Sequence, residues 1–210
     1  MSSIVSMEVP GSTFNSSIVG ENLEIVGQQG EENIIEVKGD SPITLFGGSL
    51  NDEITTGAGD ASVFGGDGND LIQGGIGDDI FLGGEGDDII SSGLGADFVF
   101  GGAGDDTIRG GLPGMDLDNP IGDTLDGGAG ADVFEFALDE FVSGAVDEIV
   151  DFQADEFADS IRIFGVGDGS VSYNADTGIV SVNDQEAIDI GTDLDVEATR
   201  EDDSDTWELF

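Results

Sequence analysis

Residues 65–91 read GGDGNDLIQ GGIGDDIFL GGEGDDIIS, a nine-residue unit that is repeated three times without a gap. Each unit has the form Gly-Gly-x-Gly-x-Asp-x-apolar-x. A fixed short period of this kind predicts a solenoid, in which each unit packs mainly against its neighbours. The other segments are therefore interpreted as the beginning, the end or an extension of this stack.

Copies of the unit continue on both sides, so that nine run from Gly47 to Glu135. Intact copies occupy residues 65–73, 74–82, 83–91, 101–109 and 127–135. The other copies depart from the pattern at Leu50 (third Gly), Thr56 (first Gly), Ala61 (the Asp) and Ser92 (first Gly). The eighth copy begins at Gly110 and resumes at Asp123. The extra residues between them, around Leu112–Ile121, include two prolines and predict a loop.

The eighth position of every copy is apolar, whereas the seventh and ninth positions include polar residues such as Thr55 and Gln73. This alternation predicts a short strand with one buried face. One unit then gives one turn and one strand, and two units make one coil with strands in two sheets. The expected core residues are Ile54, Val63, Ile72, Phe81, Ile90, Val99, Ile108, Leu125 and Phe134.

Units that are two apart in sequence are expected to stack along one side of the coil, about 4.8 Å apart. We call the side formed by the odd-numbered copies the odd edge and the other side the even edge. The sixth positions of the odd edge are Asp52, Asp70, Asp88, Asp106 and Asp132. Those of the even edge are Ala61, Asp79, Asp97 and Asp123. We expect a complete odd edge and an even edge that is weakened at Ala61 and interrupted in the eighth copy.

The composition restricts the possible partners. The chain has 210 residues, with 47 Asp and Glu against four Lys and Arg, a formal net charge of -43, and no Cys or His. This imbalance argues against nucleic acid and against anionic membrane surfaces, both of which attract clustered Lys and Arg. The missing residue types exclude disulfides, zinc sites built on imidazole or thiolate, and His-based acid–base catalysis. Hard divalent cations, which prefer oxygen ligands, remain as the natural counterpart.

The repeated unit offers oxygen ligands of the kind that calcium prefers. Its glycines allow backbones to approach closely, so that carbonyl oxygens can point to one spot, and its Asp adds a charged oxygen. We therefore predict four or more calcium ions between stacked turns. The best sites are expected at the pairs Asp70–Asp88, Asp88–Asp106, Asp79–Asp97 and Asp106–Asp132, and less complete sites at Asp52–Asp70, Ala61–Asp79 and Asp97–Asp123. The fifth-position residues Asp60, Asp78, Asp87 and Asp105 are expected to face solvent.

The in-phase recurrence of this unit resembles the repeats-in-toxin, or hemolysin-type calcium-binding, family. The resemblance implies an all-β fold, a right-handed parallel β-roll with calcium in both rows of turns. It also implies that carbonyls at positions two and four of one turn, and one and three of the stacked turn, join the two aspartates. The carbonyl ligands implied in this way are those of Gly66, Gly68, Gly75, Gly77, Gly83, Gly84, Glu85, Gly86, Gly101 and Ala103.

The segments outside the repeats are interpreted as a leader, two caps and a tail. The predicted division is a flexible leader (1–22), N-terminal cap strands (23–46), the β-roll (47–135), a β-rich C-terminal cap (136–197) and an acidic tail (198–210). Residues 171–173 and 179–182 flank a Gly-containing turn and predict a β-hairpin.

The tail, which ends in Asp205-Thr206-Trp207-Glu208-Leu209-Phe210, has two interpretations. It is either a strand that packs its aromatic residues on the cap, or the uncleaved export signal that an ABC-type secretion machine reads in the family that the repeats resemble. Residues 1–25 lack the basic segment and the continuous apolar core of a secretory signal peptide. No apolar run is long enough for a transmembrane helix. We therefore expect an extracellular protein that is secreted without an N-terminal signal peptide.

Three functions are compatible with this pattern. The leading hypothesis is a secreted calcium-binding protein that folds when it binds calcium. The first alternative is a structural or adhesive component of a cell-surface layer or matrix, which could form homo-oligomers through its sheet ends. The second is a secretion and stability accessory of an extracellular enzyme. Catalysis by this chain is not predicted, because no recognisable set of acid, base and nucleophile is present.

Overall fold

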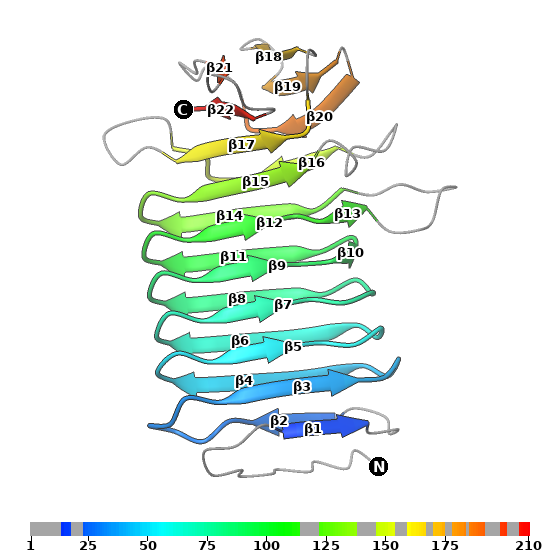
Figure 1. Ribbon diagram of the computed structural model, residues 1–210, viewed down its shortest axis with the longest axis vertical. Coiled ribbons are helices and arrows are strands. Elements are labelled where there is room, and N and C mark those ends of the chain that lie inside the picture. The colour runs from blue at the N-terminus through cyan, green and yellow to red at the C-terminus, as the bar shows by residue number, and fades with distance from the viewer. Residues whose placement is uncertain are drawn as a thin grey trace.

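A computed structural model shows the chain as a stack of short strands that wind in flat coils (Figure 1). The structure describes residues 14–17, 23–113, 122–137, 146–153, 159–166, 170–174, 178–183, 185–191, 198–200 and 206–210. All regular elements in these ranges are strands, and no helix that is long and apolar enough to cross a membrane occurs among them. The fold is an all-β parallel β-roll, as the repeats predict.

The strands of the described residues form two sheets of ten strands each. Sheet A has the order β1 (Phe14–Ser17), β3 (Ile34–Lys38), β5 (Glu53–Thr55), β7 (Leu71–Gln73), β9 (Ile89–Ser91), β12 (Thr107–Arg109), β15 (Val133–Ala137), β17 (Ser160–Phe164), β22 (Trp207–Leu209) and β21 (Ala198–Arg200). Sheet B has the order β18 (Val171–Asn174), β19 (Ile179–Val182), β20 (Gln185–Asp189), β16 (Asp147–Ile149), β14 (Thr124–Ala129), β11 (Phe98–Ala103), β8 (Ile80–Glu85), β6 (Ala61–Asp67), β4 (Ile43–Ser49) and β2 (Leu23–Val26). The short strands β10 (Leu94–Gly95) and β13 (Leu112–Pro113) pair beside them.

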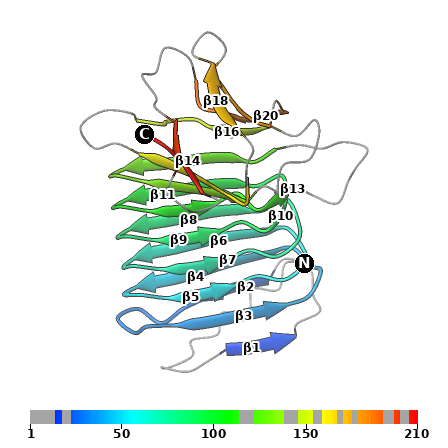
Figure 2. The same ribbon diagram turned by 45° about the horizontal axis from the view of Figure 1, so that its top comes forward.

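Residues that are 18 positions apart lie side by side in the central coils. Strand β6 pairs in parallel with β8, so that Val63 faces Phe81, and β7 pairs in parallel with β9, so that Ile72 faces Ile90. Two nine-residue units therefore make one coil, with one strand in each sheet. Both views show the coils stacked in one direction from the N-terminal to the C-terminal end (Figures 1 and 2).

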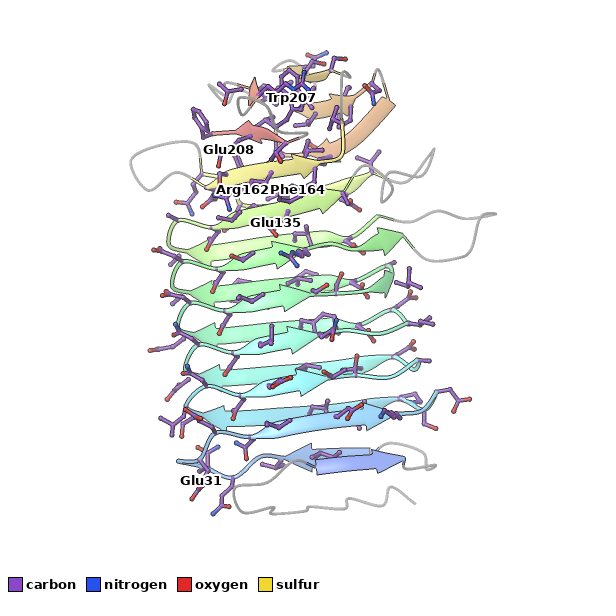
Figure 3. The ribbon with its side chains drawn as sticks, in the orientation of Figure 1. Glu31, Glu135, Arg162, Phe164, Trp207 and Glu208 are labelled. Carbon is purple, nitrogen blue, oxygen red and sulfur yellow. The ribbon has the colours of Figure 1, made fainter. Side chains whose placement is uncertain are left out.

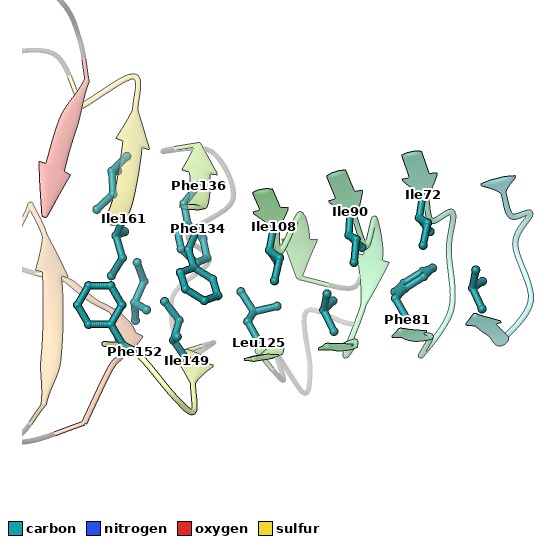
Figure 4. Close-up of a cluster of buried hydrophobic side chains, with 14 of the residues drawn as sticks. Ile72, Phe81, Ile90, Ile108, Leu125, Phe134, Phe136, Ile149, Phe152 and Ile161 are labelled. Carbon is teal, nitrogen blue, oxygen red and sulfur yellow. The ribbon is translucent and has the colours of Figure 1, made fainter. Parts of the chain in front are cut away.

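The core between the two sheets consists of the eighth-position side chains. All nine of these residues are buried with no measurable exposure, which confirms the alternation read from the sequence. They form one ladder along each sheet, and the two ladders face each other across the coil (Figure 4). The ladders extend beyond the repeats, because Ile35 joins Ile54 in sheet A and Ile149 joins Leu125 in sheet B. The apolar period thus places at least one buried side chain in each repeat strand, and β15 buries both Phe134 and Phe136.

At the N-terminal end, the strands continue further than the sequence indicated. Strand β1 lies within the expected leader of residues 1–22 and pairs in parallel with β3. An exposed strand edge offers unpaired N–H and C=O groups, so its backbone can recruit a segment that has no apolar period of its own. The expectation of a leader without regular structure is therefore wrong for Phe14–Ser17.

At the C-terminal end, parallel stacking changes to antiparallel pairing. Strands β18 and β19 form the predicted hairpin, and β19 also pairs antiparallel with β20. Strand β22 pairs antiparallel with β17 and buries Leu209 completely, so this part of the tail packs on the cap. Antiparallel strands of this kind cover the end of the stack.

Two of the few cations in the chain hold this end together (Figure 3). Arg109 Nε donates to Glu135 Oε2 at 2.6 Å, and Arg162 Nε donates to Glu208 Oε1 at 3.2 Å. A guanidinium nitrogen of Arg162 also lies 3.7 Å from Glu135 Oε1. These residues form a ladder of alternating charge across β12, β15, β17 and β22, in which each arginine pairs with a carboxylate of a neighbouring strand.

Candidate metal centre

The sixth-position aspartates form two rows, one along each edge of the roll. The turns that follow sheet B strands carry the odd edge, on the left of Figure 1, and the turns that follow sheet A strands carry the even edge, on the right. The aspartate of each turn immediately precedes the next short strand, as Asp70 precedes β7 and Asp79 precedes β8. All eight predicted aspartates are buried, with at most 3% of their surface exposed.

One carboxylate oxygen of each aspartate is used to hold the stack. The backbone N–H of Asp70 donates to Asp88 Oδ1 at 2.7 Å, and the N–H of Asp88 donates to Asp106 Oδ1 at 2.8 Å. The same bond joins Asp52 to Asp70, Asp106 to Asp132, Asp79 to Asp97, Asp97 to Asp123, and Ala61 to Asp79. The rows are therefore continuous chains of backbone-to-carboxylate hydrogen bonds.

The second carboxylate oxygen has a different environment. Oδ2 is buried and has no hydrogen-bond partner among the described residues in Asp52, Asp70, Asp79, Asp88, Asp97, Asp106 and Asp132. A buried carboxylate oxygen without a partner costs free energy, about 1–3 kcal/mol and more when the group is charged. Such a row of oxygens indicates that these groups are built to contact something other than the chain itself.

The first glycine of each odd-edge copy lies next to this oxygen. A β-carbon placed on Gly65 would collide with Asp70 Oδ2 of its own turn and with the carbonyl oxygen of Gly83 in the next coil. The same two kinds of oxygen surround Gly47, Gly83 and Gly101. We call this place the cradle of a copy. It is bordered by the first residue of the copy, by Oδ2 of the aspartate in the same turn, and by the carbonyl oxygen of the first residue in the next coil. Glycine keeps it free of side-chain atoms.

Burial raises the pKa of these aspartates well above the ordinary value. Burial raises the pKa of Asp70, Asp97 and Asp106 to about 7, although a backbone N–H from the neighbouring coil opposes the rise in each case. The pKa of Asp79 and of Asp88 rises to about 6 for the same reason. Neighbouring carboxylates such as Asp88 add repulsion at Asp70. The rows thus hold charges that a cation would relieve.

The carbonyls implied by the family resemblance are distributed over the turns. Those of Gly83 and Gly101 border cradles. The carbonyls of Gly66, Gly68 and Gly84 face the glycines of the next coil at equivalent positions, and so does that of Gly86. Three others accept backbone hydrogen bonds, since Glu85 accepts from Gly68, Ala103 from Gly86, and Gly75 from Leu94. Gly77 lies in the even-edge turn, where its N–H donates to Leu94.

These oxygens offer a mixed set of calcium ligands instead of a cluster of acidic side chains. Among the described residues, no three His, Cys, Asp or Glu side chains converge on one point. A ligand set must therefore combine carboxylate Oδ2 atoms with backbone carbonyls, which is the kind of mixed oxygen shell that calcium accepts. The buried Oδ2 atoms and the glycine-bordered cradles fit that requirement.

The even edge is more continuous than the sequence suggested. Strand β11 pairs directly with β14, so Phe98 faces Thr124 although 26 residues separate them. The N–H of Asp97 donates to Asp123 Oδ1 at 2.8 Å, as in the pairs without an insertion. The expected interruption in the eighth copy is therefore wrong, because β14 pairs with β11 in the same register as the strands of the copies without an insertion. The Asp52–Asp70 pair is likewise formed with the same bond as its neighbours.

Three residues that the repeat pattern did not identify extend the rows. The N–H groups of Asp123 and Asp132 donate to Asp147 Oδ1 and Asp159 Oδ1, at 2.8 and 3.0 Å. Asn33 donates its backbone N–H to Asp52 Oδ1 at 2.6 Å. The signal for the two aspartates is the Asp-x-apolar triplet, which recurs in Asp147-Glu148-Ile149 and Asp159-Ser160-Ile161 without the preceding glycines.

The fifth-position residues lie on the surface, as predicted, and their carboxylates accept hydrogen bonds from backbone N–H groups of the neighbouring coil. Asp60, Asp78, Asp87 and Asp105 are exposed. The N–H of Asp105 donates to Asp87 Oδ1 at 2.9 Å, and the N–H of Ala96 donates to Asp78 Oδ1 at 3.1 Å. A second, solvent-exposed series of hydrogen bonds therefore runs parallel to each buried row.

Comparison with known families gives one match, and it covers the rows. A family model for the RTX calcium-binding nonapeptide repeat matches in four copies, at residues 46–81, 55–90, 82–112 and 122–137. The matched ranges contain all eight predicted aspartates and omit most of the inserted residues between Leu112 and Gly122. No curated protein and no solved structure matches the chain significantly.

Proposed function

Because residues 46–112 and 122–137 match the RTX calcium-binding nonapeptide repeat, we propose that this chain is a secreted calcium-binding protein whose roll folds as calcium enters its rows. The observation that carries the proposal is the series of buried Oδ2 atoms without hydrogen-bond partners among the described residues. On the odd edge, these atoms lie beside a glycine-bordered position and the carbonyl of the next coil. Calcium supplies the positive charge that these oxygens lack.

The chain's own residues divide the work within each turn. The Oδ1 atom of an aspartate fixes the N–H of the preceding coil, which sets the spacing of the turns. The Oδ2 atom is then held in place by the same rigid carboxylate. The first glycine keeps side-chain atoms out, and the strand that follows anchors the turn through a fully buried side chain such as Ile72 or Ile90. The fold thus positions the oxygen ligands. The stability of the fold in turn depends on neutralising the negative charge of the aspartates.

Folding and binding should therefore be one process. In a chain with a net charge of -43, stacking the turns brings buried carboxylates together without compensating cations. Burial and neighbouring carboxylates both oppose their charged form, as the raised pKa of Asp70 and Asp106 shows. Binding free energy that is available only in the folded state becomes folding free energy. We infer that the repeats stay open without calcium and close when calcium is present at millimolar concentration.

The test is a calcium titration of the whole chain followed by far-ultraviolet circular dichroism, starting in excess chelator at neutral pH. We expect a disordered spectrum in chelator and a β spectrum that saturates with calcium. Magnesium serves as the control, because it demands a stricter octahedron and keeps its water, so it should not replace calcium at equal concentration. A complete β spectrum already present in chelator would refute the coupling of folding to calcium.

Export from the cell is the second part of the proposal. The last strand, β22, is added to sheet A in antiparallel fashion and is fastened by the Arg162–Glu208 ion pair, so it can leave without breaking a parallel coil. This supports a terminal segment that an ABC-type machine reads before the roll closes. Deleting residues 198–210 should retain the protein inside a host that has such a machine, whereas Arg162→Gln should be exported normally. Unchanged export of the deletion variant would remove this part of the proposal.

A further inference from the structure

The two edges differ at the residue that borders the cradle. On the odd edge, every copy begins with glycine, at Gly47, Gly65, Gly83, Gly101 and Gly127. On the even edge, two of the copies begin with a hydroxyl residue, Thr56 and Ser92. Both of these side chains are buried, with 6% and 0% of their surface exposed. A side chain therefore occupies the place that glycine leaves clear on the odd edge.

The contacts of Ser92 show what its hydroxyl does there. The hydroxyl donates a hydrogen bond to the carbonyl oxygen of Gly110, the first residue of the next copy on the same edge. The same hydroxyl lies close enough to the carboxylate of Asp97, the aspartate of its own turn, to oppose the rise of that group's pKa, while Asp97 Oδ2 has no hydrogen-bond partner among the described residues. On the odd edge, the equivalent pair of groups around Gly83 is Asp88 Oδ2 and the carbonyl of Gly101. The Ser92 hydroxyl thus lies between the two groups that would otherwise face a cation.

A side-chain amide occupies a comparable place outside the repeats, at the N-terminal end of the odd edge. The place beside Gly27 is taken by the side-chain amide of Asn33. Its Nδ2 donates to the carbonyl of Gly47 at 3.3 Å and to Asp52 Oδ1 at 2.9 Å. A neutral donor of the protein again bridges a carbonyl of one coil and an aspartate of a row. The two positions thus share the contact with the carbonyl of the next coil, while Asp52 Oδ2 has no hydrogen-bond partner among the described residues.

We propose that calcium loads the two edges unequally, because the Ser92 hydroxyl takes the place of the ion in the cradle of Asp97. This inference rests on the proposed function, since it concerns which of the repeats hold calcium. The glycine-bordered cradles of the odd edge take ions, whereas the Ser92 cradle is closed by a group of the protein. One hydroxyl in the middle of the even edge thereby reduces the number of ions that the roll binds.

The backbone makes the exchange of the two residue types a fair test. Among the described residues, positive φ occurs at the second glycine of most copies, such as Gly66, Gly84 and Gly102, but not at the first. Serine at the first position therefore needs no left-handed backbone, as Ser92 shows, but at Gly83 its β-carbon meets Asp88 Oδ2 and the carbonyl of Gly101, so that turn has to widen to admit it. Ser92→Gly and Gly83→Ser exchange the two cradle types without requiring a left-handed conformation of serine.

The experiment is a count of calcium ions per chain, by equilibrium dialysis against radioactive calcium, for the wild-type chain and the two variants. Ser92→Gly should bind one ion more than wild type, and Gly83→Ser should bind one ion fewer. Circular dichroism in saturating calcium checks that each variant is folded, and Gly83→Ser decides the question if Ser92→Gly does not fold.

The outcomes separate this inference from the proposed function. A wild-type chain that binds no calcium overturns both. A wild-type chain that binds calcium, together with a Ser92→Gly count that is unchanged or lower, overturns the inference alone, and a lower count would assign the hydroxyl as a ligand. A Gly83→Ser chain that is folded and keeps the full wild-type count would also overturn it.

Discussion

At the scale of single residues, the repeated aspartate has two functions that belong to its two oxygens. Oδ1 accepts the N–H of the neighbouring coil, and Oδ2 lies buried at the cradle. A glutamate side chain would be too long to keep a carboxylate oxygen at hydrogen-bond distance from the backbone N–H of the neighbouring coil. Asparagine would keep this hydrogen bond but lose the charge. The short, charged acceptor is therefore required by stacking and by cation binding at once.

Asp88 belongs to the middle of the odd row, so its loss should damage two adjacent pairs. Asp88→Ala removes the acceptor for the N–H of Asp70, leaves that buried donor unsatisfied, and removes one charged ligand. We expect it to lower the free energy of unfolding in saturating calcium by about 1–3 kcal/mol. The calcium midpoint in a circular dichroism titration should rise several-fold.

Asp78 is the matched control for Asp88, because it lies in an adjacent copy and faces solvent. Its carboxylate accepts an exposed hydrogen bond from the N–H of Ala96, at 3.1 Å. Asp78→Ala should therefore change the free energy of unfolding by about 0.5 kcal/mol or less and leave the ion count intact. Equal effects of the two variants would contradict the assignment of the buried row as the binding row.

Leu50 carries backbone strain because its position in the repeat has a positive φ, as Gly68 and Gly86 show in other copies. It replaces the third glycine of the first copy and has φ of 81°, where an L-residue other than glycine costs about 1–2 kcal/mol. Its side chain is 49% exposed, so little burial would be lost on removal. Leu50→Gly should raise the free energy of unfolding by about 1 kcal/mol, measured by urea denaturation in calcium.

Leu71 provides the comparison for Leu50, since it is 46% exposed but lies in the extended strand β7. Leu71→Gly should lower the free energy of unfolding by about 0.5–1 kcal/mol, because glycine weakens a strand interior. The two leucine-to-glycine changes are thus expected to have opposite signs. A destabilising effect at both positions would show that the contacts of the Leu50 side chain outweigh the strain in its backbone.

At the scale of the elements, the coil is the unit of stability. Each short strand contributes one fully buried side chain, and its neighbours in sequence face outward. A strand of three residues, such as β9, has too few hydrogen bonds to be stable alone. Its place is therefore fixed by the buried side chain and by the coils on both sides.

Ile90 and Ile89 separate these contributions within one strand. Ile90 is completely buried and Ile89 is 46% exposed, although they are adjacent. Ile90→Ala should lower the free energy of unfolding in calcium by about 2–5 kcal/mol, the range for a cavity in a packed core. Ile89→Ala should change it by no more than about 0.5 kcal/mol. Thermal unfolding in saturating calcium would measure both, and similar effects would contradict the assignment of the inward face.

Much of the fold could be predicted from the sequence because the same residue types recur in phase. The period of nine predicts that Ile72, Phe81 and Ile90 lie in the core, and all three are fully buried. Strand β1 could not be predicted, since it is recruited by a backbone edge and has no repeat signal. The continuity across the eighth copy could not be predicted either, because spacing in sequence does not show whether extra residues leave the stack or displace it.

The candidate site was predicted in part for a similar reason. Its aspartates follow the motif, whereas Asn33, Asp147 and Asp159 extend the rows without the glycines that define it. The role of Ser92 depends on three-dimensional contacts, since its carbonyl partner Gly110 is 18 residues away. Substitution of a glycine in a motif indicates a weaker copy, but it does not show which group the new side chain meets.

At the scale of the whole molecule, the balance between burial and charge controls folding. Burial raises the pKa of Asp70, Asp97 and Asp106 to about 7, against an ordinary value near 3.8. The folded state therefore binds protons more tightly than the unfolded chain. This contribution to stability is fully present below about pH 4 and is lost as the pH rises through about 7.

The metal-free chain should consequently fold on acidification. In chelator, we expect the β signal in circular dichroism to be larger at pH 5 than at pH 8, because the buried carboxyl groups are then protonated. In the presence of calcium, the midpoint of the titration should rise as the pH falls from 8 to 5, since protons compete for the same oxygens. A calcium midpoint that does not depend on pH would contradict this competition.

The stacking of units 18 residues apart also makes the length of this molecule discrete. Each coil adds one strand to each sheet and about 4.8 Å along the axis. Deleting residues 65–82 joins Phe64 to Gly83 and preserves the phase of every later copy. The shortened chain should fold in calcium. A chain that lacks residues 65–78 joins Phe64 to Asp79, which breaks the phase of the later copies, and it should not fold. Circular dichroism would show whether each deletion variant folds, and small-angle scattering would measure its length. If only the 18-residue deletion folds, the length of this roll can change only in steps of one strand spacing.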